Sequence, residues 1–175
     1  MIISLSEIMS VKNKTEHIEA PLELSYFELD GIQYEIVEKE KVNLEIISKG
    51  ERSISFSAKT KLSLIIPCGR CLDDVKIPFD IDVSKDLDFN DTDDDRIKDL
   101  DELNYIDGYK LDIDLLIFDE ILLGFPLQVL CEPNCKGICK VCGTNLNKQS
   151  CDCDQSIGDL RMSVIQDIFK NYKEV

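Results

Sequence analysis

The chain has 175 residues, which is enough for one domain or for one domain with a small appendage. Hydrophobic residues make up 43% of it, a share that argues against global disorder. The formal net charge of −15 excludes a broadly basic surface for phosphate binding. The longest apolar runs fall far below the ~18–20 residues of a membrane span, so we expect no membrane partner.

Alternating apolar and polar residues in the first half predict a β-rich domain. The stretch Ala20–Leu29 is a weak strand candidate. Val42–Ile46 and Ser53–Ser63 alternate clearly and are separated by turn-forming residues, so we expect an antiparallel hairpin. Val75–Val83 continues the sheet, and Pro78 within it favours an edge strand.

An acidic segment follows these strands. Asp86–Glu102 holds nine acidic and two basic residues, a composition that favours a solvated loop. An acidic docking segment for a basic partner is the alternative interpretation.

Two helices are predicted in the second half. Asp112–Leu123 has helical spacing and is apolar on most faces, so we expect it to be buried. Asp112 or Asp114 can cap its start, and Gly124 ends it. An amphipathic stripe predicts a last helix at Asp159–Tyr172.

A single histidine and eight cysteines limit the possible chemistry. His17 lies in a polar stretch, where we expect a solvated side chain rather than the base of a catalytic triad. The N-terminal residues lack the basic and apolar parts of an export signal, so we expect a cytoplasmic protein whose cysteines bind metal instead of forming disulfides. No glycine-rich phosphate loop is present, and we expect neither an enzyme nor a small-molecule substrate.

Six of the cysteines fall within 23 residues, between the two predicted helices. Thiolates favour zinc or iron over magnesium or calcium, and four of them form closed zinc sites. The most local set for one ion is Cys139, Cys142, Cys151 and Cys153. Because the side chains of a Cys-x-Cys pair in extended chain point to opposite sides, Cys131 and Cys135 are alternatives for one or both members of that pair.

Cys68 and Cys71 form a further Cys-x2-Cys pair after the strand at Ser53–Ser63. The pair either completes a site with the later cysteines or belongs to a second ion, so we expect one or two Zn2+ ions. A pair of half-buried thiols and a rubredoxin-like iron centre are weaker alternatives. Thioredoxin-like exchange is also weaker, because the pair leads into a strand and not into a helix whose N-terminus would lower a thiol pKa.

Several motifs occur in the order typical of one family. They are Cys68-Gly-Arg-Cys71-Leu after a strand, an apolar helix from Asp114 to Leu123, a cysteine run from Leu130 to Asn147, then Cys151-Asp-Cys153 and Asp159-Leu-Arg161. With these motifs, roughly Ser53 to Tyr172 resembles the YceD family of bacterial large ribosomal RNA subunit accumulation proteins, which has plastid relatives. The sequence departs from the family pattern at Ile138 and Leu160, neither of which is a proposed ligand.

The resemblance implies a non-enzymatic factor that supports accumulation or processing of 23S (large-subunit) ribosomal RNA and assembly of the large ribosomal subunit. The partner would be this RNA or a basic ribosomal protein, and the negative net charge favours the protein. Direct RNA contact would need a local basic patch, for which the available side chains are Lys136, Lys140, Lys148, Arg70 and Arg161. The alternatives are a zinc-binding adaptor in another pathway and a thiol redox protein.

The predicted fold is α+β, with an antiparallel, curved or barrel-like sheet, a buried helix, a cysteine-rich metal knuckle and a C-terminal helix. We expect a β-rich main domain at residues 1–130, with the acidic loop at 86–102 and the helix at 112–123. Residues 131–175 form the zinc-knuckle segment and the C-terminal helix. The expected core residues are Phe56, Leu62, Leu64, Phe79, Leu115, Phe118, Leu122 and Ile168.

Overall fold

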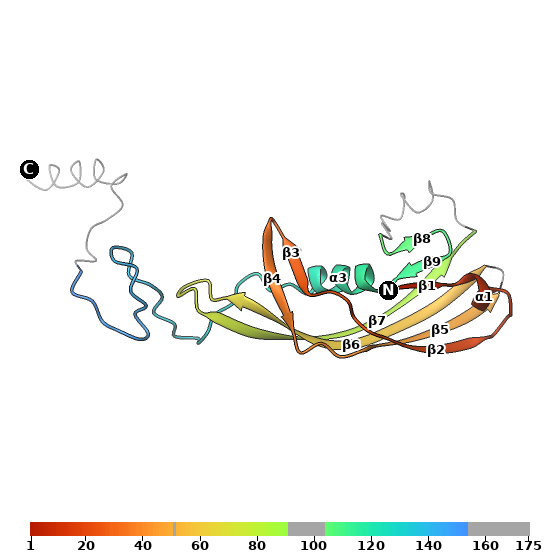
Figure 1. The fold of residues 1–175 in the computed structure, drawn as a ribbon, viewed down its shortest axis with the longest axis horizontal. Helices are drawn as coiled ribbons and strands as arrows, with labels where there is room; N and C mark the ends of the chain where they lie inside the picture. The colour runs from red at the N-terminus through yellow and green to blue at the C-terminus, as the bar shows by residue number, and fades with distance from the viewer. Residues whose placement is uncertain (51, 91–103, 154–175) are drawn as a thin grey trace, which may run out of the picture. The chain divides into compact units, whose positions relative to one another are not determined.

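A computed structural model describes residues 1–50, 52–90 and 104–153 (Figure 1). The chain divides into two units. The first consists of Met1–Ile66 and Lys76–Leu127, and the second of Pro67–Val75 and Gln128–Val175. The predicted helix at Asp159–Tyr172, with the expected core residue Ile168, lies outside the described residues.

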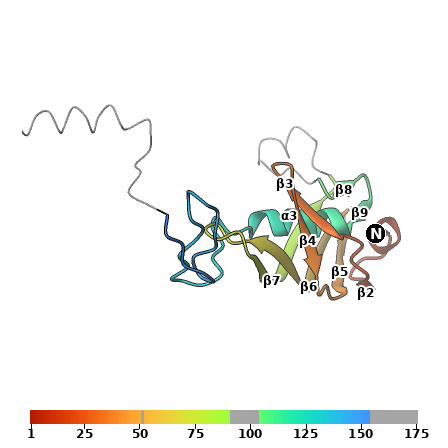
Figure 2. The same cartoon turned by 60° about the vertical axis from the view of Figure 1, so that its left-hand side comes forward.

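The first unit is built on a curved sheet whose strands are β2 (Thr15–Ala20), β3 (Tyr26–Leu29), β4 (Ile32–Val37), β5 (Val42–Gly50), β6 (Ser53–Pro67) and β7 (Asp74–Asp88). The predicted hairpin is confirmed, since β5 and β6 pair antiparallel with Leu44 opposite Ala58. Figure 2 shows β7, β6, β5 and β2 side by side. Within the described part of the chain β7 pairs only with β6, so it is the edge strand that Pro78 predicts.

Several short elements were not predicted from the sequence. Ala20–Leu29 is not one strand, because β2 ends at Ala20, before Pro21, and β3 begins at Tyr26. A proline lacks the N–H that a strand ladder needs, which explains the break. Strand β4 and the one-turn helix α1 (Ser6–Met9) were also not predicted. A small second sheet, formed by β1 (Ile2–Ser4), β9 (Lys110–Asp112) and β8 (Ile106–Asp107), was not predicted either.

Helix α3 (Ile113–Leu123) lies across one face of the sheet, as Figures 1 and 2 show. The carboxylate of Asp112 caps it by accepting hydrogen bonds from the backbone N–H groups of Asp114 and Leu115, and the helix ends at Gly124. Its buried residues are Ile113, Leu116, Ile117 and Ile121. Leu115 and Leu122 were expected in the core but are 44% and 43% exposed, because they lie on the opposite side of the helix.

The core of the first unit contains Phe56, Leu62, Leu64 and Phe79, as expected. An aromatic cluster joins the helix to the β3–β4 hairpin. The fully buried ring of Phe27 lies 4.8 Å from Phe118 and 5.4 Å from Phe125, measured between ring centroids. These contacts and the mostly antiparallel sheet confirm the α+β fold class.

The acidic segment begins as a strand and not as a loop, because β7 continues through Asp88. The rest of the expected loop, from residue 91 to 102, lies outside the described residues. Over the ranges that the structure describes, no helix is long and apolar enough to cross a membrane.

Candidate metal centres

Tight turns hold the cysteines of the second unit. Cys68 and Cys71 lie between the end of β6 and the start of β7. The turn is closed by a hydrogen bond from Leu72 N–H to the Cys68 carbonyl at 3.0 Å and by one from Cys68 N–H to the Asp73 carbonyl at 2.8 Å. Two thiols with two residues between them are thereby brought into the same group.

A similar turn holds Cys139 and Cys142. The N–H of Gly143 donates to the carbonyl of Cys139 at 2.9 Å, and the N–H of Cys139 donates to the carbonyl of Thr144 at 2.8 Å. Gly143 has a φ of +73°, a backbone conformation that glycine adopts without steric cost. The glycine after the second cysteine therefore allows the chain to fold back at this point.

The eight thiols gather into two groups of four, and within each group all sulfur atoms lie within 4.8 Å of one another. The first thiol site consists of Cys68, Cys71, Cys131 and Cys135. The second thiol site consists of Cys139, Cys142, Cys151 and Cys153, the set that is most local in sequence. Each of these sites could hold one metal ion.

The spacing of the sulfur atoms fits a tetrahedral ion. Four thiolates at about 2.3 Å from a central zinc ion would lie about 3.8 Å from one another. In the first thiol site the Sγ atoms of Cys68 and Cys135 are 3.8 Å apart, and those of Cys71 and Cys131 are 3.4 Å apart. The donor set is sulfur alone, which suits zinc or iron and not a hard cation.

The two thiol sites differ in exposure. In the first site Cys68, Cys71 and Cys135 are buried and Cys131 is half-buried. The second site has only one buried cysteine, and its Cys142 is exposed. Metal in the first site would therefore be better shielded from solvent and from competing ligands.

Hydrogen bonds set the thiol acidities of the first site. Backbone hydrogen bonds, first from Cys71 and then from Arg70, lower the pKa of Cys68 to about 6. The pKa of Cys131 rises to about 12, chiefly because its side chain hydrogen-bonds with Cys71. The pKa of Cys135 is lowered as well, so two of the four thiols ionise readily, whereas close sulfur neighbours make ionisation of the other two costly.

The second thiol site also contains thiols with lowered pKa values and thiols with raised pKa values. The side chain of Thr144 is the main cause that lowers the pKa of Cys142 to about 6, and hydrogen bonding to Cys142 raises the pKa of Cys153 to about 12. A divalent cation removes this conflict, because it stabilises all four thiolates at once. Both sites therefore have the chemistry of a cation-binding centre.

Two of the basic residues near the thiol sites are engaged by neighbouring groups. Arg70 donates from Nη1 to the Cys135 carbonyl at 3.0 Å, and Lys148 Nζ lies 3.0 Å from Asp73 Oδ1. Lys136 and Lys140 are exposed. Arg161 lies outside the described residues, so its place in such a patch stays a prediction.

Three further residues at the thiol sites were not identified from the sequence. Asp73, Asn145 and Asn147 hydrogen-bond to the turns that hold the cysteines. The asparagines lie within the motif between Cys142 and Cys151, but nothing in their spacing indicates which sulfur or carboxylate they reach.

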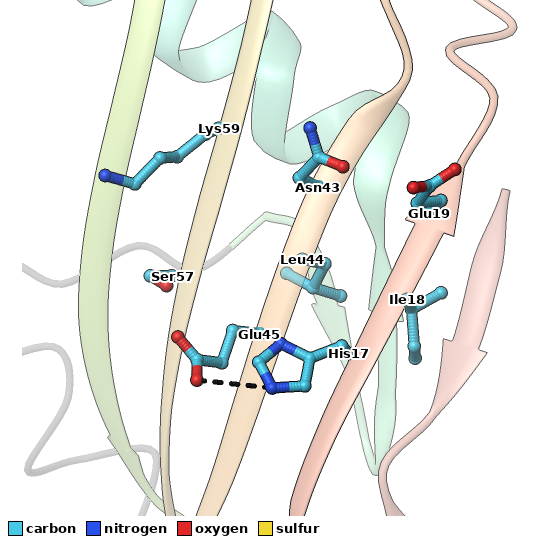
Figure 3. Close-up of a pocket in the computed structure, with 8 residues that line it drawn as sticks. All are labelled: His17, Ile18, Glu19, Asn43, Leu44, Glu45, Ser57 and Lys59. Carbon is cyan, nitrogen blue, oxygen red and sulfur yellow. Dashed lines mark ion pairs between the residues drawn. The ribbon is translucent and has the colours of Figure 1, made fainter.

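The exposed face of the sheet carries a hollow of about 380 Å3 lined by residues of β2, β5 and β6 (Figure 3). His17 lies in it, 3.6 Å from Glu45 between Nε2 and Oε1, and Ser57 lines it as well. The His17 side chain is 73% exposed, as expected for a solvated histidine. Lys59, which also lines the hollow, is paired with Asp82 at 2.8 Å.

A curved sheet with a helix on one face and two four-thiol sites in turns defines a small α+β protein whose cysteine groups could each hold a metal ion. A family model described as large ribosomal RNA subunit accumulation protein YceD matches residues 55–169. The chain belongs to this family, which confirms the resemblance of its motifs.

Individual relatives match over shorter stretches. The uncharacterized protein YlbN of Bacillus subtilis is 35% identical over 81 residues, which cover 46% of this chain and 45% of the relative. The chloroplastic large ribosomal RNA subunit accumulation protein YCED homolog 1 of Arabidopsis thaliana is 40% identical over 50 residues, or 29% of this chain and 16% of the relative. Its Zea mays counterpart is 49% identical over 45 residues, or 25% and 15%. The matches thus span less than half of each relative, and no solved structure matches significantly.

Proposed function

We propose that this chain is a non-enzymatic factor that supports the accumulation or processing of large-subunit ribosomal RNA, and with it assembly of the large ribosomal subunit. The observation that carries the proposal is the family match over residues 55–169. The plant relatives are named for large ribosomal RNA subunit accumulation, which supports the same role. All eight cysteines are free thiols, which favours a reducing compartment such as the cytoplasm.

We infer that each thiol site holds Zn2+. Both sites offer sulfur donors alone, all within 4.8 Å of one another, and the 3.4 Å and 3.8 Å sulfur separations in the first site fit tetrahedral zinc. Four protein ligands leave no open position for water or substrate, so zinc would supply structural stabilisation and not catalysis. The turns around the cysteines contain few buried apolar side chains, and bound zinc would replace the missing hydrophobic core.

The partner that the charges favour is a basic ribosomal protein. The net charge of −15 repels phosphate, whereas it attracts the cationic surface of a ribosomal protein. Two of the basic side chains near the thiol sites, Arg70 and Lys148, are already engaged by a carbonyl and a carboxylate. In the described part of the second unit, the exposed Lys136 and Lys140 remain for contact with RNA.

Depletion of the protein in the organism that encodes it tests the proposed role. We expect a fall in the ratio of 23S to 16S ribosomal RNA and fewer complete large subunits, with rescue by the wild-type chain. A Cys68→Ser, Cys71→Ser variant should rescue poorly if the zinc site supports the function. An unchanged RNA ratio and unchanged subunit profile after depletion would contradict the proposal.

Crosslinking in cells distinguishes the two kinds of partner. We expect a basic large-subunit protein to be recovered with the chain, and the Lys136→Glu, Lys140→Glu variant to rescue as well as wild type. These two lysines are suitable because they are exposed, whereas changing Lys148 would also break its ion pair with Asp73. Recovery of ribosomal RNA alone, lost in this variant, would instead show direct RNA contact.

A further inference from the structure

The loop that closes the second thiol site also touches the first. Only the three residues from Lys136 to Ile138 separate Cys135, a ligand of the first site, from Cys139 of the second. Asn147 lies in the loop between Cys142 and Cys151, both in the second site. Its Nδ2 lies 3.2 Å from the Sγ of Cys135, and its Oδ1 accepts a hydrogen bond from the N–H of Lys136 at 2.7 Å.

Asp73 provides a second connection between the sites. Its backbone carbonyl accepts a hydrogen bond from the N–H of Cys68 at 2.8 Å, and thereby closes a turn of the first site. Its carboxylate accepts from Asn145 Nδ2 at 2.8 Å and pairs with Lys148 Nζ at 3.0 Å. Both of these partners belong to the loop of the second site.

Backbone hydrogen bonds also connect the two sites. The N–H of Ile138, between the two sites, donates to the carbonyl of Arg70 at 3.2 Å, and Arg70 lies in the turn of the first site. The N–H of Leu146 donates to the carbonyl of Gly137 at 2.9 Å. The loop of the second site is thus bonded to the segment between the sites, and that segment to the first site.

The position of this loop depends on the second site. Eight residues separate Cys142 from Cys151, and the loop contains only one apolar side chain, Leu146, which is half-buried. An ion held by cysteines on both sides of the loop would restrict its conformations far more than this single apolar contact. Metal in the second site would therefore place Asn147 against Cys135.

We propose that the two thiol sites bind their ions cooperatively, and that Asn147 is the positioning residue that couples them. The proposal rests on the metal binding inferred above. An ion in the second site fixes the loop, and the amide of Asn147 then donates to the Cys135 thiolate and stabilises it as a ligand. By linkage, an ion in the first site holds Cys135 and favours the loop position that the second site needs.

The expected strength of the coupling follows from other metal sites in proteins. Loss of a hydrogen bond to a metal ligand lowers metal affinity by roughly 10–100-fold. Because coupling between two binding sites is reciprocal, the loss of either site should weaken the other by the same factor. We expect that factor to be about tenfold, since Asn147 is exposed and water competes for its hydrogen bonds.

The test is a Zn2+ titration of the full chain against a coloured chelator, with native mass spectrometry to count bound ions. A Cys139→Ser, Cys142→Ser variant reports the first site alone, and a Cys68→Ser, Cys71→Ser variant reports the second. We expect both isolated sites to bind about tenfold more weakly than in the wild type. We also expect the singly loaded wild-type protein to be less abundant at one equivalent of zinc than two independent sites would give.

Asn147→Ala should lower the zinc affinity of the first site about tenfold. When the second site is removed from the Asn147→Ala variant, the zinc affinity of the first site should fall little further. Gln149→Ala is the matched control, because Gln149 is exposed in the same loop and should leave both affinities unchanged. Asn147→Asp keeps the acceptor for Lys136 N–H but puts a carboxylate near the Cys135 sulfur, so it should bind zinc no better than Asn147→Ala. If Asn147 acted only by holding the loop through Lys136 N–H, Asn147→Asp would restore the zinc affinity that Asn147→Ala loses.

Equal affinities in the isolated and paired sites would overturn cooperativity. Coupling that survives Asn147→Ala unchanged would overturn the role of Asn147. Neither result bears on the inferred metal binding itself, which fails only if the wild-type chain takes up fewer than two ions.

Discussion

A Cβ atom on Gly137 would lie 3.0 Å from the carbonyl oxygen of Arg70, closer than a side chain normally approaches backbone. The segment between the thiol sites therefore runs directly against the turn that carries Cys68 and Cys71. Gly137 also has a φ of +77°, which disfavours any residue with a Cβ.

Gly137→Ala should therefore weaken zinc retention more than Gly143→Ala. Gly143 has a similar φ of +73° but no atom within 4 Å of the Cβ position, so it controls for backbone strain, which costs roughly 1–2 kcal/mol. The rate of zinc loss to an excess of chelator measures the difference. Equal rates for the two variants would show that the approach to Arg70 does not matter.

Phe27→Ala should destabilise the first unit by about 3–5 kcal/mol, because it empties the centre of the aromatic cluster. Phe27 is fully buried, with ring centroids 4.8 Å from Phe118 and 5.4 Å from Phe125. Urea unfolding followed by circular dichroism measures the change. The neighbouring Tyr26 is 58% exposed, and Tyr26→Ala should change stability by less than about 0.5 kcal/mol.

Asp112→Ala should destabilise the chain by about 1 kcal/mol, since it removes the acceptor at the start of α3. The carboxylate accepts from Asp114 N–H at 3.0 Å and from Leu115 N–H at 3.5 Å. Asp112→Asn retains an acceptor oxygen and should keep most of the stability in the same urea experiment. If Asp112→Ala and Asp112→Asn lost the same free energy of unfolding, the capping interaction would be unimportant.

Chelation of zinc should affect the two units differently. Hydrogen exchange of the full chain, with and without excess EDTA, should show faster exchange at residues 67–75 and 128–153. Exchange along β5 and β6 should change little, because their pairing rests on a buried apolar face and not on metal. Uniform loss of protection across both regions would contradict this division.

The sequence predicts the sheet where its pattern is strong. Ser53–Ser63 alternates over its whole length and lies within β6, whose Ile54, Phe56 and Leu62 are buried. The β3–β4 hairpin was missed although its signal was present, since Asp30-Gly31 is a favoured hairpin turn and both residues have positive φ. Short strands such as β8, with two residues, are too brief to show any period.

Helix α3 was predicted with its cap and its end, but its orientation was not. Apolar residues on most of its faces give no indication of which side is buried, and Leu115 and Leu122 were therefore misplaced. The grouping of the cysteines was left open for a similar reason. Only the tertiary structure brings Cys68 and Cys71 within reach of Cys131 and Cys135, about 60 residues later in the chain.

The most direct test of the two metal centres is a metal count on the purified full chain, prepared without chelator. We expect two zinc ions in the wild type, one in the Cys68→Ser, Cys71→Ser variant and one in the Cys139→Ser, Cys142→Ser variant. A wild-type chain that holds no zinc, or a single ion lost with either pair, would contradict the existence of two separate four-thiolate sites.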